Sequence, residues 1–292
     1  MTKAPISYTA TTVILNENCR LTKYAPLKIG SGSIKSIDLD LLGHVTAKKT
    51  PMSDFVKPKL KAFKRTLPNP YKTRDIELDN IALSFALNFA GSKDPIIIGE
   101  TYILRETKTA KFHAYLPSHD AISLSAATTY KYSIDSTMSP TNFEELFKLT
   151  RKSLQNHPPL SLTLRRHSAS LLRDDLNDKY IDLSIALESL ISASSEISYK
   201  FSLLNTIIAE QDKNKRYDIF KLLRIFYSAR SKIVHGSVVS SDYLKDSDFS
   251  RIKALAKLAI FYKIRFFAQG NSEEKWSRHM HCLALGQETP EW

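Results

Sequence analysis

The spacing of apolar residues changes near residue 140, and this change limits the folds that the chain can adopt. Before it, apolar residues alternate with smaller or polar ones over 81–89, which is the pattern of a half-buried strand. Further strands are indicated near the N-terminus and by alternating runs at 96–104, 112–116 and 130–134. After it, apolar residues recur at helical spacing. We therefore predict an α+β protein, with a β-rich domain over 1–139 followed by an all-α helical bundle over 140–292.

The helical part opens with a capping-box pattern, because Thr141 is followed three positions later by Glu144. Paired prolines within 156–161 then end this first helix. Beyond them, the apolar period predicts helices at 161–173, 177–192, 196–210, 214–235, 242–268 and 272–284. The glycines of this part lie at or beyond expected helix ends, at positions Gly236, Gly270 and Gly286.

The charge balance favours an anionic partner. Lys and Arg number 42 against 30 Asp and Glu, which gives a formal net charge of +12. Nucleic acid is the first partner that such an excess indicates, and an anionic membrane surface is the second. No stretch approaches 18 uninterrupted apolar residues, and the N-terminus has no apolar signal core, so we expect no membrane association. Cys19 and Cys282 lie far apart and form no disulfide pattern, and we expect a cytoplasmic protein.

An arginine interrupts the apolar stripe of the expected helix at 214–235. The stripe consists of Ile219, Leu222, Leu223, Phe226, Ala229 and Ile233, and Arg230 lies among them. A guanidinium without a partner is costly to bury, so Arg230 needs a carboxylate or a polar cleft. Glu188 lies on a face with Ile181, Ile185 and Ser192 in the helix before, and we predict that Glu188 and Arg230 are neighbours. Such a pair is either a structural salt bridge or part of a cleft.

His235 is expected to end the same helix, because Gly236 suits the position that follows a helix. The negative end of the helix dipole favours a positively charged imidazole there. Histidine changes charge near neutral pH, and arginine binds phosphate. Together His235 and Arg230 are suited to acid–base chemistry on a phosphodiester.

These residues carry a family resemblance over roughly 161–270. The segments "YIDLSIALESLIS" and "RIFYSARSKIVHGS" resemble the HEPN superfamily, and specifically its ApeA-like branch. The signature of that family is Arg, a polar residue, three further residues and His. In this chain, the signature residues are Arg230, Ser231 and His235, followed at once by Gly236.

The resemblance implies a metal-independent endoribonuclease without a cofactor, in which the 2′-hydroxyl of RNA attacks the phosphate. His235 would be the acid or base, Arg230 the phosphate contact and Ser231 an auxiliary contact, with Glu188 beside Arg230. It also implies a homodimer through the HEPN domain, and a role in bacterial antiviral defence, as an abortive-infection effector, or in a toxin-type system. The N-terminal domain would be sensory or regulatory, and a trigger or antitoxin protein is an expected partner.

Two other functions remain open at this point. The first is a HEPN module that does not cleave but binds RNA or a protein partner, with Arg230 and His235 buried and paired. The second is a purely structural dimerisation bundle that serves an activity of the N-terminal half, with the best pocket around 30–116.

Two basic segments are candidate RNA-binding sites. The segment 57–74 combines Lys59, Lys61, Lys64 and Arg65 with aromatic residues, although its prolines favour a solvated loop. An early bundle helix carries Arg165, Arg166 and Arg173, for which a solvated helix face is the simpler interpretation.

Two other patterns resemble metal sites. "GSGSIKSIDLD" at 30–40 is similar to a nucleotidyltransferase motif with Asp38 and Asp40 as Mg²⁺ ligands, but the spacing is too short for that fold, and a turn before a short strand is the better interpretation. His279, His281 and Cys282 cluster near the C-terminus but have no fourth spaced ligand, and we expect no metal there.

Overall fold

The chain folds into two compact units, residues 1–148 and 149–292. The computed structural model describes residues 7–15, 18–19, 27–29, 32–36, 61–67, 73–90, 97–106, 111–116, 133–134, 140–173, 175–191, 195–236 and 245–290. The boundary between the units falls inside the helix Pro140–Asn156 (α4) and not at its start.

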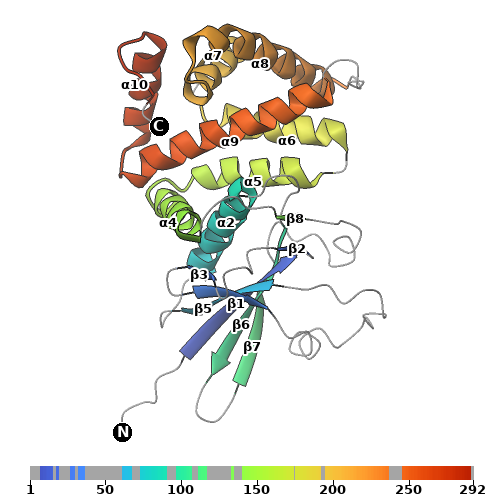
Figure 1. The fold of residues 1–292 in the computed structure, drawn as a ribbon, viewed down its shortest axis with the longest axis vertical. Coiled ribbons are helices and arrows are strands. Elements are labelled where there is room, and N and C mark those ends of the chain that lie inside the picture. The colour runs from blue at the N-terminus through green and yellow to red at the C-terminus, as the bar shows by residue number, and fades with distance from the viewer. Residues whose placement is uncertain are drawn as a thin grey trace. The chain divides into compact units, whose positions relative to one another are not determined.

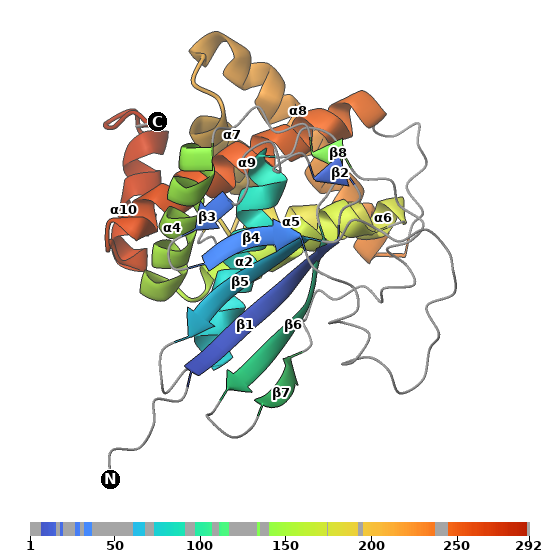
Figure 2. The same ribbon diagram turned by 60° about the horizontal axis from the view of Figure 1, so that its bottom comes forward.

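The first unit contains a six-stranded sheet. Its strands are β1 (Ser7–Leu15), β3 (Leu27–Ile29), β4 (Gly32–Ser36), β5 (Lys61–Leu67), β6 (Ile97–Glu106) and β7 (Lys111–Leu116). Their order is β3-β4-β5-β1-β6-β7, every neighbouring pair is antiparallel, and Figure 2 shows β5, β1, β6 and β7 side by side. The central strand β1 is rich in threonine, valine and isoleucine, which favour extended backbone. Two short strands, β2 (Asn18–Cys19) and β8 (Ser133–Ile134), pair in parallel.

The prediction of a strand at 81–89 was wrong, because this segment belongs to the helix α2 (Thr73–Ala90). The alternation that suggested a strand placed small residues between large ones. In the helix almost every position of 81–88 that the structure describes is buried, including Ala82, Ser84 and Ala86. A helix buried on all sides needs no polar face, and alanine favours helix, so the period-2 pattern carried no information about its backbone. α2 packs against β6.

The prediction of an all-α bundle is confirmed. Its helices are α4, α5 (Leu160–Leu172), α6 (Leu176–Glu188), α7 (Ile197–Ala209), α8 (Lys213–Val234), α9 (Asp246–Ala268) and α10 (Glu273–Ala284) (Figure 1). Pro158 and Pro159 form the turn between α4 and α5, as paired prolines predicted. Among the residues that the structure describes, no helix has the length and apolar character needed to cross a bilayer.

Aromatic rings join α6, α7, α8 and α9 in the bundle core. Tyr180 of α6 lies 5.5 Å from Phe226 of α8 and 4.9 Å from Phe249 of α9, measured between ring centroids. Phe201 of α7 also contacts Phe226. The predicted apolar stripe of α8 is buried, apart from its last member Ile233, which is half-buried. This core fixes which face of α8 points inward and therefore places Arg230 at the edge of that face.

Candidate functional site

Arg230 of α8 forms an ion pair with Glu188, the last residue of α6. The distance between Arg230 Nη2 and Glu188 Oε2 is 3.3 Å, and the two side chains are 24% and 29% exposed. The prediction that these residues are neighbours is confirmed. Ile181 and Ile185, predicted to share a face with Glu188, are half-buried as Glu188 is, and Ser192 lies outside the described residues. The pair therefore lies where the core meets the surface.

The guanidinium of Arg230 has hydrogen-bonding capacity that the protein leaves unused. Its Nε is buried and has no hydrogen-bond partner. Its carbon Cζ lies 5.6 Å from the ring centroid of Tyr227, one turn earlier on α8, in a cation–π contact. Burial and the nearby Glu188 carboxylate raise the pKa of Tyr227, while Arg230 lowers it. Tyr227 was not predicted as a site residue, although its position three residues before Arg230 was a usable signal.

His235 occupies the position directly after the last turn of α8 and is exposed. Its backbone N–H donates to the carbonyl of Ser231 at 3.1 Å, so Ser231 supports the end of the helix. Gly236 has a φ of +85°, a left-handed conformation that glycine adopts without strain. The helix therefore ends where predicted. Arg230 and His235, both of which the structure describes, lie at the same end of α8, and no hydrogen bond joins them.

The end of α6 that carries Glu188 is held by side chains of three other helices. Asn205 of α7 donates to the carbonyl of Leu187 at 3.3 Å. Lys263 of α9 donates to the carbonyl of Ser189 at 2.9 Å. Trp276 of α10 donates through Nε1 to the carbonyl of Leu190 at 2.8 Å. These bonds join the end of α6 and the turn after it to three other helices, and so they fix the position of Glu188.

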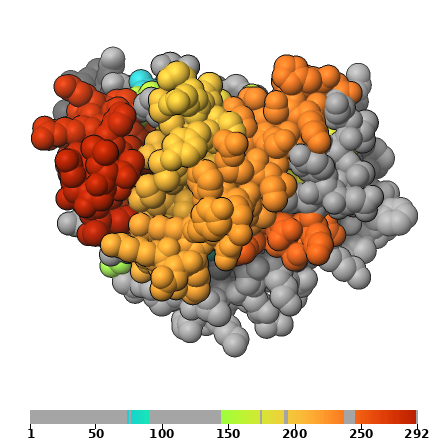
Figure 3. Space-filling view, turned by 90° about the horizontal axis from the view of Figure 1, so that it is seen from above, coloured from blue at the N-terminus to red at the C-terminus, as the bar shows by residue number. Residues whose placement is uncertain are grey.

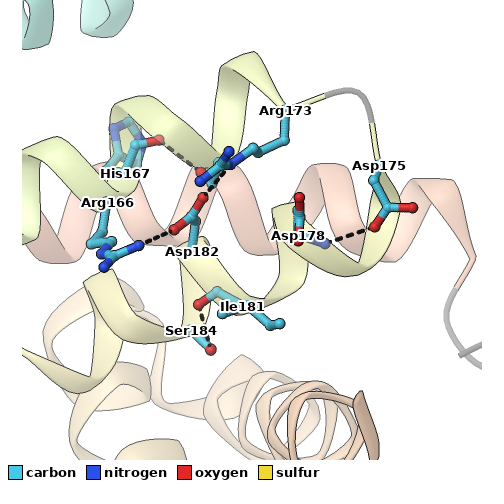
Figure 4. Close-up of polar contacts among 9 residues, drawn as sticks. Arg166, His167, Arg173, Asp175, Asp178, Ile181, Asp182 and Ser184 are labelled. Carbon is cyan, nitrogen blue, oxygen red and sulfur yellow. Dashed lines mark hydrogen bonds and ion pairs between the residues drawn. The ribbon is translucent and has the colours of Figure 1, made fainter. Parts of the chain in front are cut away.

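Two of the arginines predicted to bind RNA take part in a structural cluster (Figure 4). Arg166 Nη1 and Arg173 Nε bind the two oxygens of Asp182 at 2.7 and 2.9 Å, and the Asp182 side chain is 3% exposed. The hydrogen bond that Arg173 donates to Asp182 raises the pKa of Arg173. Arg165 is half-buried. The charges of Arg166 and Arg173 are therefore partly neutralised by Asp182. Asp182 was not predicted as a site residue, because its neighbours in α6 are apolar.

The basic segment 57–74 is not a continuous loop. Lys59 lies outside the described residues, whereas Lys61, Lys64 and Arg65 belong to β5. The backbone of β5 pairs with β1 on one side and with β4 on the other, so residues 61–67 form an inner strand of the sheet.

The two patterns that resemble metal sites were not expected to bind a metal. Asp38 and Asp40 lie outside the described residues, and the strand β4 begins at Gly32. His279 forms hydrogen bonds with Tyr262 and Glu288, whereas His281 Nδ1 bonds to the carbonyl of Ser277 in its own helix. In the part of the chain that the structure describes, no three such ligands gather around one point.

The candidate site is therefore the junction of α6 and α8, with Glu188, Tyr227, Arg230, Ser231 and His235. It provides a fixed cation, an adjacent carboxylate and an exposed imidazole. Comparison with protein-family models, with curated proteins and with solved structures gave no match.

Proposed function

We propose that the protein is a metal-independent endoribonuclease of the HEPN type and the effector of a bacterial antiviral-defence or toxin-type system. The observation that carries this proposal is that Arg230 is held in place by one carboxylate and still partly exposed. Glu188 holds one of its terminal nitrogens, its side chain is 24% exposed, and the exposed His235 ends the same helix. A cation that is oriented but not saturated is suited to binding an additional anion such as a phosphate.

The reaction would be a transesterification within RNA. A base removes the proton of the 2′-hydroxyl, the oxygen attacks the neighbouring phosphorus, and the 5′-oxygen leaves as it accepts a proton. The products are a 2′,3′-cyclic phosphate and a free 5′-hydroxyl. His235 supplies the acid or base, Arg230 stabilises the charge on the phosphate, and Ser231 is an auxiliary contact. These steps assign no role to a metal or cofactor.

The outer face of α8 supports an anionic substrate. Tyr217, Lys221, Arg224 and Lys232 are exposed along this helix, which lies with α7 on the face shown in Figure 3. Basic groups contact phosphates and exposed aromatic rings stack on bases. We further propose that the active form is a homodimer through the helical unit, and that the N-terminal unit responds to a trigger or antitoxin protein.

A non-catalytic module that binds RNA or a protein is the alternative, and one observation favours it. The ion pair between Arg230 and Glu188 is the arrangement expected for a structural strut. The exposure of His235 counts against it, because a purely structural histidine would be buried and paired.

RNA cleavage in the presence of EDTA tests the proposal. We expect Arg230→Ala and His235→Ala each to lower the cleavage rate by about a hundred-fold or more. Arg251→Ala and His281→Ala, at exposed positions of α9 and α10, are matched controls that keep the wild-type rate. Analysis of the products should identify the 2′,3′-cyclic phosphate.

Two results would change the conclusion. Full cleavage by the His235→Ala variant would refute the assigned mechanism. An inactive wild type whose RNA binding still depends on Arg230 would support the non-catalytic alternative.

A double-mutant cycle separates the two possible roles of Glu188. If the pair is a strut, Glu188→Gln and Arg230→Gln are coupled in the free energy of unfolding by about 1 kcal/mol, and Glu188→Gln leaves RNA affinity unchanged. If Glu188 holds Arg230 ready for phosphate, Glu188→Gln changes RNA affinity while Arg230 is present and has no effect in the Arg230→Gln background. Affinity is measured by fluorescence anisotropy with a labelled RNA whose 2′-hydroxyls are methylated, so that it cannot be cleaved.

A further inference from the structure

A cavity of about 490 Å³ lies between the end of α9 and the segment that follows α10. It is lined by Tyr262, Arg265, Phe266 and Gln269 of α9, by His279 of α10, and by residues 286–289. Its size is that of small-molecule sites in proteins. None of these residues belongs to the junction of α6 and α8, so the cavity is independent of the function proposed above.

One wall of the cavity is aromatic. The ring of His279 stacks on those of Tyr262 and Phe266, with centroids 5.8 and 5.2 Å apart and ring planes within 14° and 21° of parallel. Phe266 is half-buried and leans edge-on against the buried Trp276 at 5.0 Å. A wall of this kind is suited to a flat ring, because stacking tolerates many planar heterocycles.

A chain of hydrogen bonds fixes this wall in place. The Tyr262 hydroxyl lies 2.7 Å from His279 Nε2, and His279 Nδ1 bonds to the Glu288 carboxylate. The Glu288 carboxylate accepts a hydrogen bond from Nδ1–H, and in this tautomer of the neutral imidazole Nε2 accepts a hydrogen bond from the Tyr262 O–H. Because both ring nitrogens are bonded, the imidazole cannot turn, and a ligand meets a preformed surface.

Polar groups lie on the same face of α9 as the aromatic wall. Tyr262, Arg265, Phe266 and Gln269 follow the i, i+3, i+4, i+7 spacing of one helix face. Arg265 is half-buried and Gln269 is exposed, so a guanidinium and an amide stand at the rim beside the rings. The Glu288 side chain, 46% exposed, adds a hydrogen-bond acceptor from the segment that follows α10.

We propose that this cavity binds a nucleoside monophosphate. The base stacks on Phe266, the phosphate contacts Arg265, and a ribose hydroxyl donates to Glu288. A carboxylate is an appropriate partner for sugar hydroxyls, and a guanidinium is the preferred partner for phosphate, so the two charges of the rim select the two ends of such a ligand.

Calorimetric titration with adenosine monophosphate, adenosine and inorganic phosphate tests the proposal on the full-length chain. We expect the monophosphate to bind more tightly than adenosine by about ten-fold, and inorganic phosphate to bind weakly. Arg265→Gln should remove this advantage, so that both ligands bind the variant equally. Arg251→Gln, at an exposed position of the same helix, is the matched control and keeps the advantage.

Phe266→Leu tests the stacking wall. It should weaken the monophosphate and adenosine alike, by about ten-fold or more. Because Phe266 also packs against Trp276, circular dichroism and the thermal transition are measured on each variant. The result for Arg265→Gln, at the rim, stands even if Phe266→Leu is unstable.

Two results would overturn the proposal. The first is the absence of binding at millimolar concentration for the monophosphates of all four bases. The second is an unchanged preference for the monophosphate over adenosine in the Arg265→Gln variant.

Discussion

Lys263 gives the stability of the helical unit a dependence on pH that can be measured. Its side chain is 3% exposed, and its ammonium meets the Ser189 carbonyl at 2.9 Å and a Glu273 carboxylate oxygen at 4.0 Å. Burial lowers the pKa of Lys263 from 10.5 to about 8, with Glu273 opposing the change. Between these two values the folded chain has released this proton and the unfolded chain still holds it. The free energy of unfolding therefore rises with pH in that window, by about 3 kcal/mol in total, and is flat on either side of it.

The variant Lys263→Met removes this titration while keeping an unbranched side chain. Urea unfolding is followed by the fluorescence of Trp276, which lies in contact with Lys263, in a Trp292→Phe background that leaves a single tryptophan. We expect the free energy of unfolding of the parent chain to rise relative to that of Lys263→Met between pH 8 and 10.5. Tyr180 and Tyr227, whose pKa values burial raises, titrate equally in both chains and cancel in the difference.

Lys275→Met, at an exposed position of α10, is the matched control and should follow the parent at every pH. Parallel curves for the parent and Lys263→Met from pH 7 to 10.5 would show that the Lys263 proton is not coupled to folding, and would refute the reasoning. The offset between the curves at pH 7 is not decisive, because it combines the lost hydrogen bond to Ser189 with the relief of a buried charge.

Two further predictions concern stability. Asp182→Asn removes the carboxylate that Arg166 and Arg173 share, and should lower the free energy of unfolding by about 1–3 kcal/mol. Asp218→Asn removes an exposed partner of Lys221 on α8 and should lower it much less, because an exposed ion pair contributes little. Equal urea midpoints for the two variants would contradict a structural role for the cluster. Tyr262→Phe removes the hydroxyl that bonds to His279 and should lower the free energy of unfolding by about 1 kcal/mol. Tyr217→Phe, at a residue that is 69% exposed, is the control. A thermal transition of Tyr262→Phe that coincides with that of the parent would contradict this prediction.

The helical bundle could be predicted from the sequence because its helices are amphipathic and end at clear signals. Paired prolines and Gly236 limit α4, α5 and α8, and the buried stripe of α8 follows the 3.6-residue period. α2 could not be predicted in this way. Its buried positions lie on all sides of the helix, so the apolar residues follow no 3.6-residue period that would indicate a helix. The choice between helix and strand therefore depended on tertiary packing.

The pair of Glu188 and Arg230 could be predicted because each is a charge that burial requires to be neutralised. The same argument applied to Asp182, which lies two turns earlier in the same helix and is more deeply buried. It was missed because its partners Arg166 and Arg173 were interpreted as a solvated helix face or a candidate RNA-binding surface, and not as partners of a buried carboxylate. The cavity beside α10 was also not foreseen, because it depends on how residues 286–289 return to α9, and a sequence pattern contains no such distance.

The carbonyls at the end of α6 have a consequence for the motions of the molecule. The carbonyls of Leu187, Ser189 and Leu190, at and just after the end of α6, each accept a hydrogen bond from a side chain of α7, α9 or α10, so this end of α6 is held to those helices. Its amide protons should exchange with solvent at the same rate as those of α9 and α10, as one cooperative unit. Glu188 thus belongs, in its dynamics, to helices that are distant from it in the sequence.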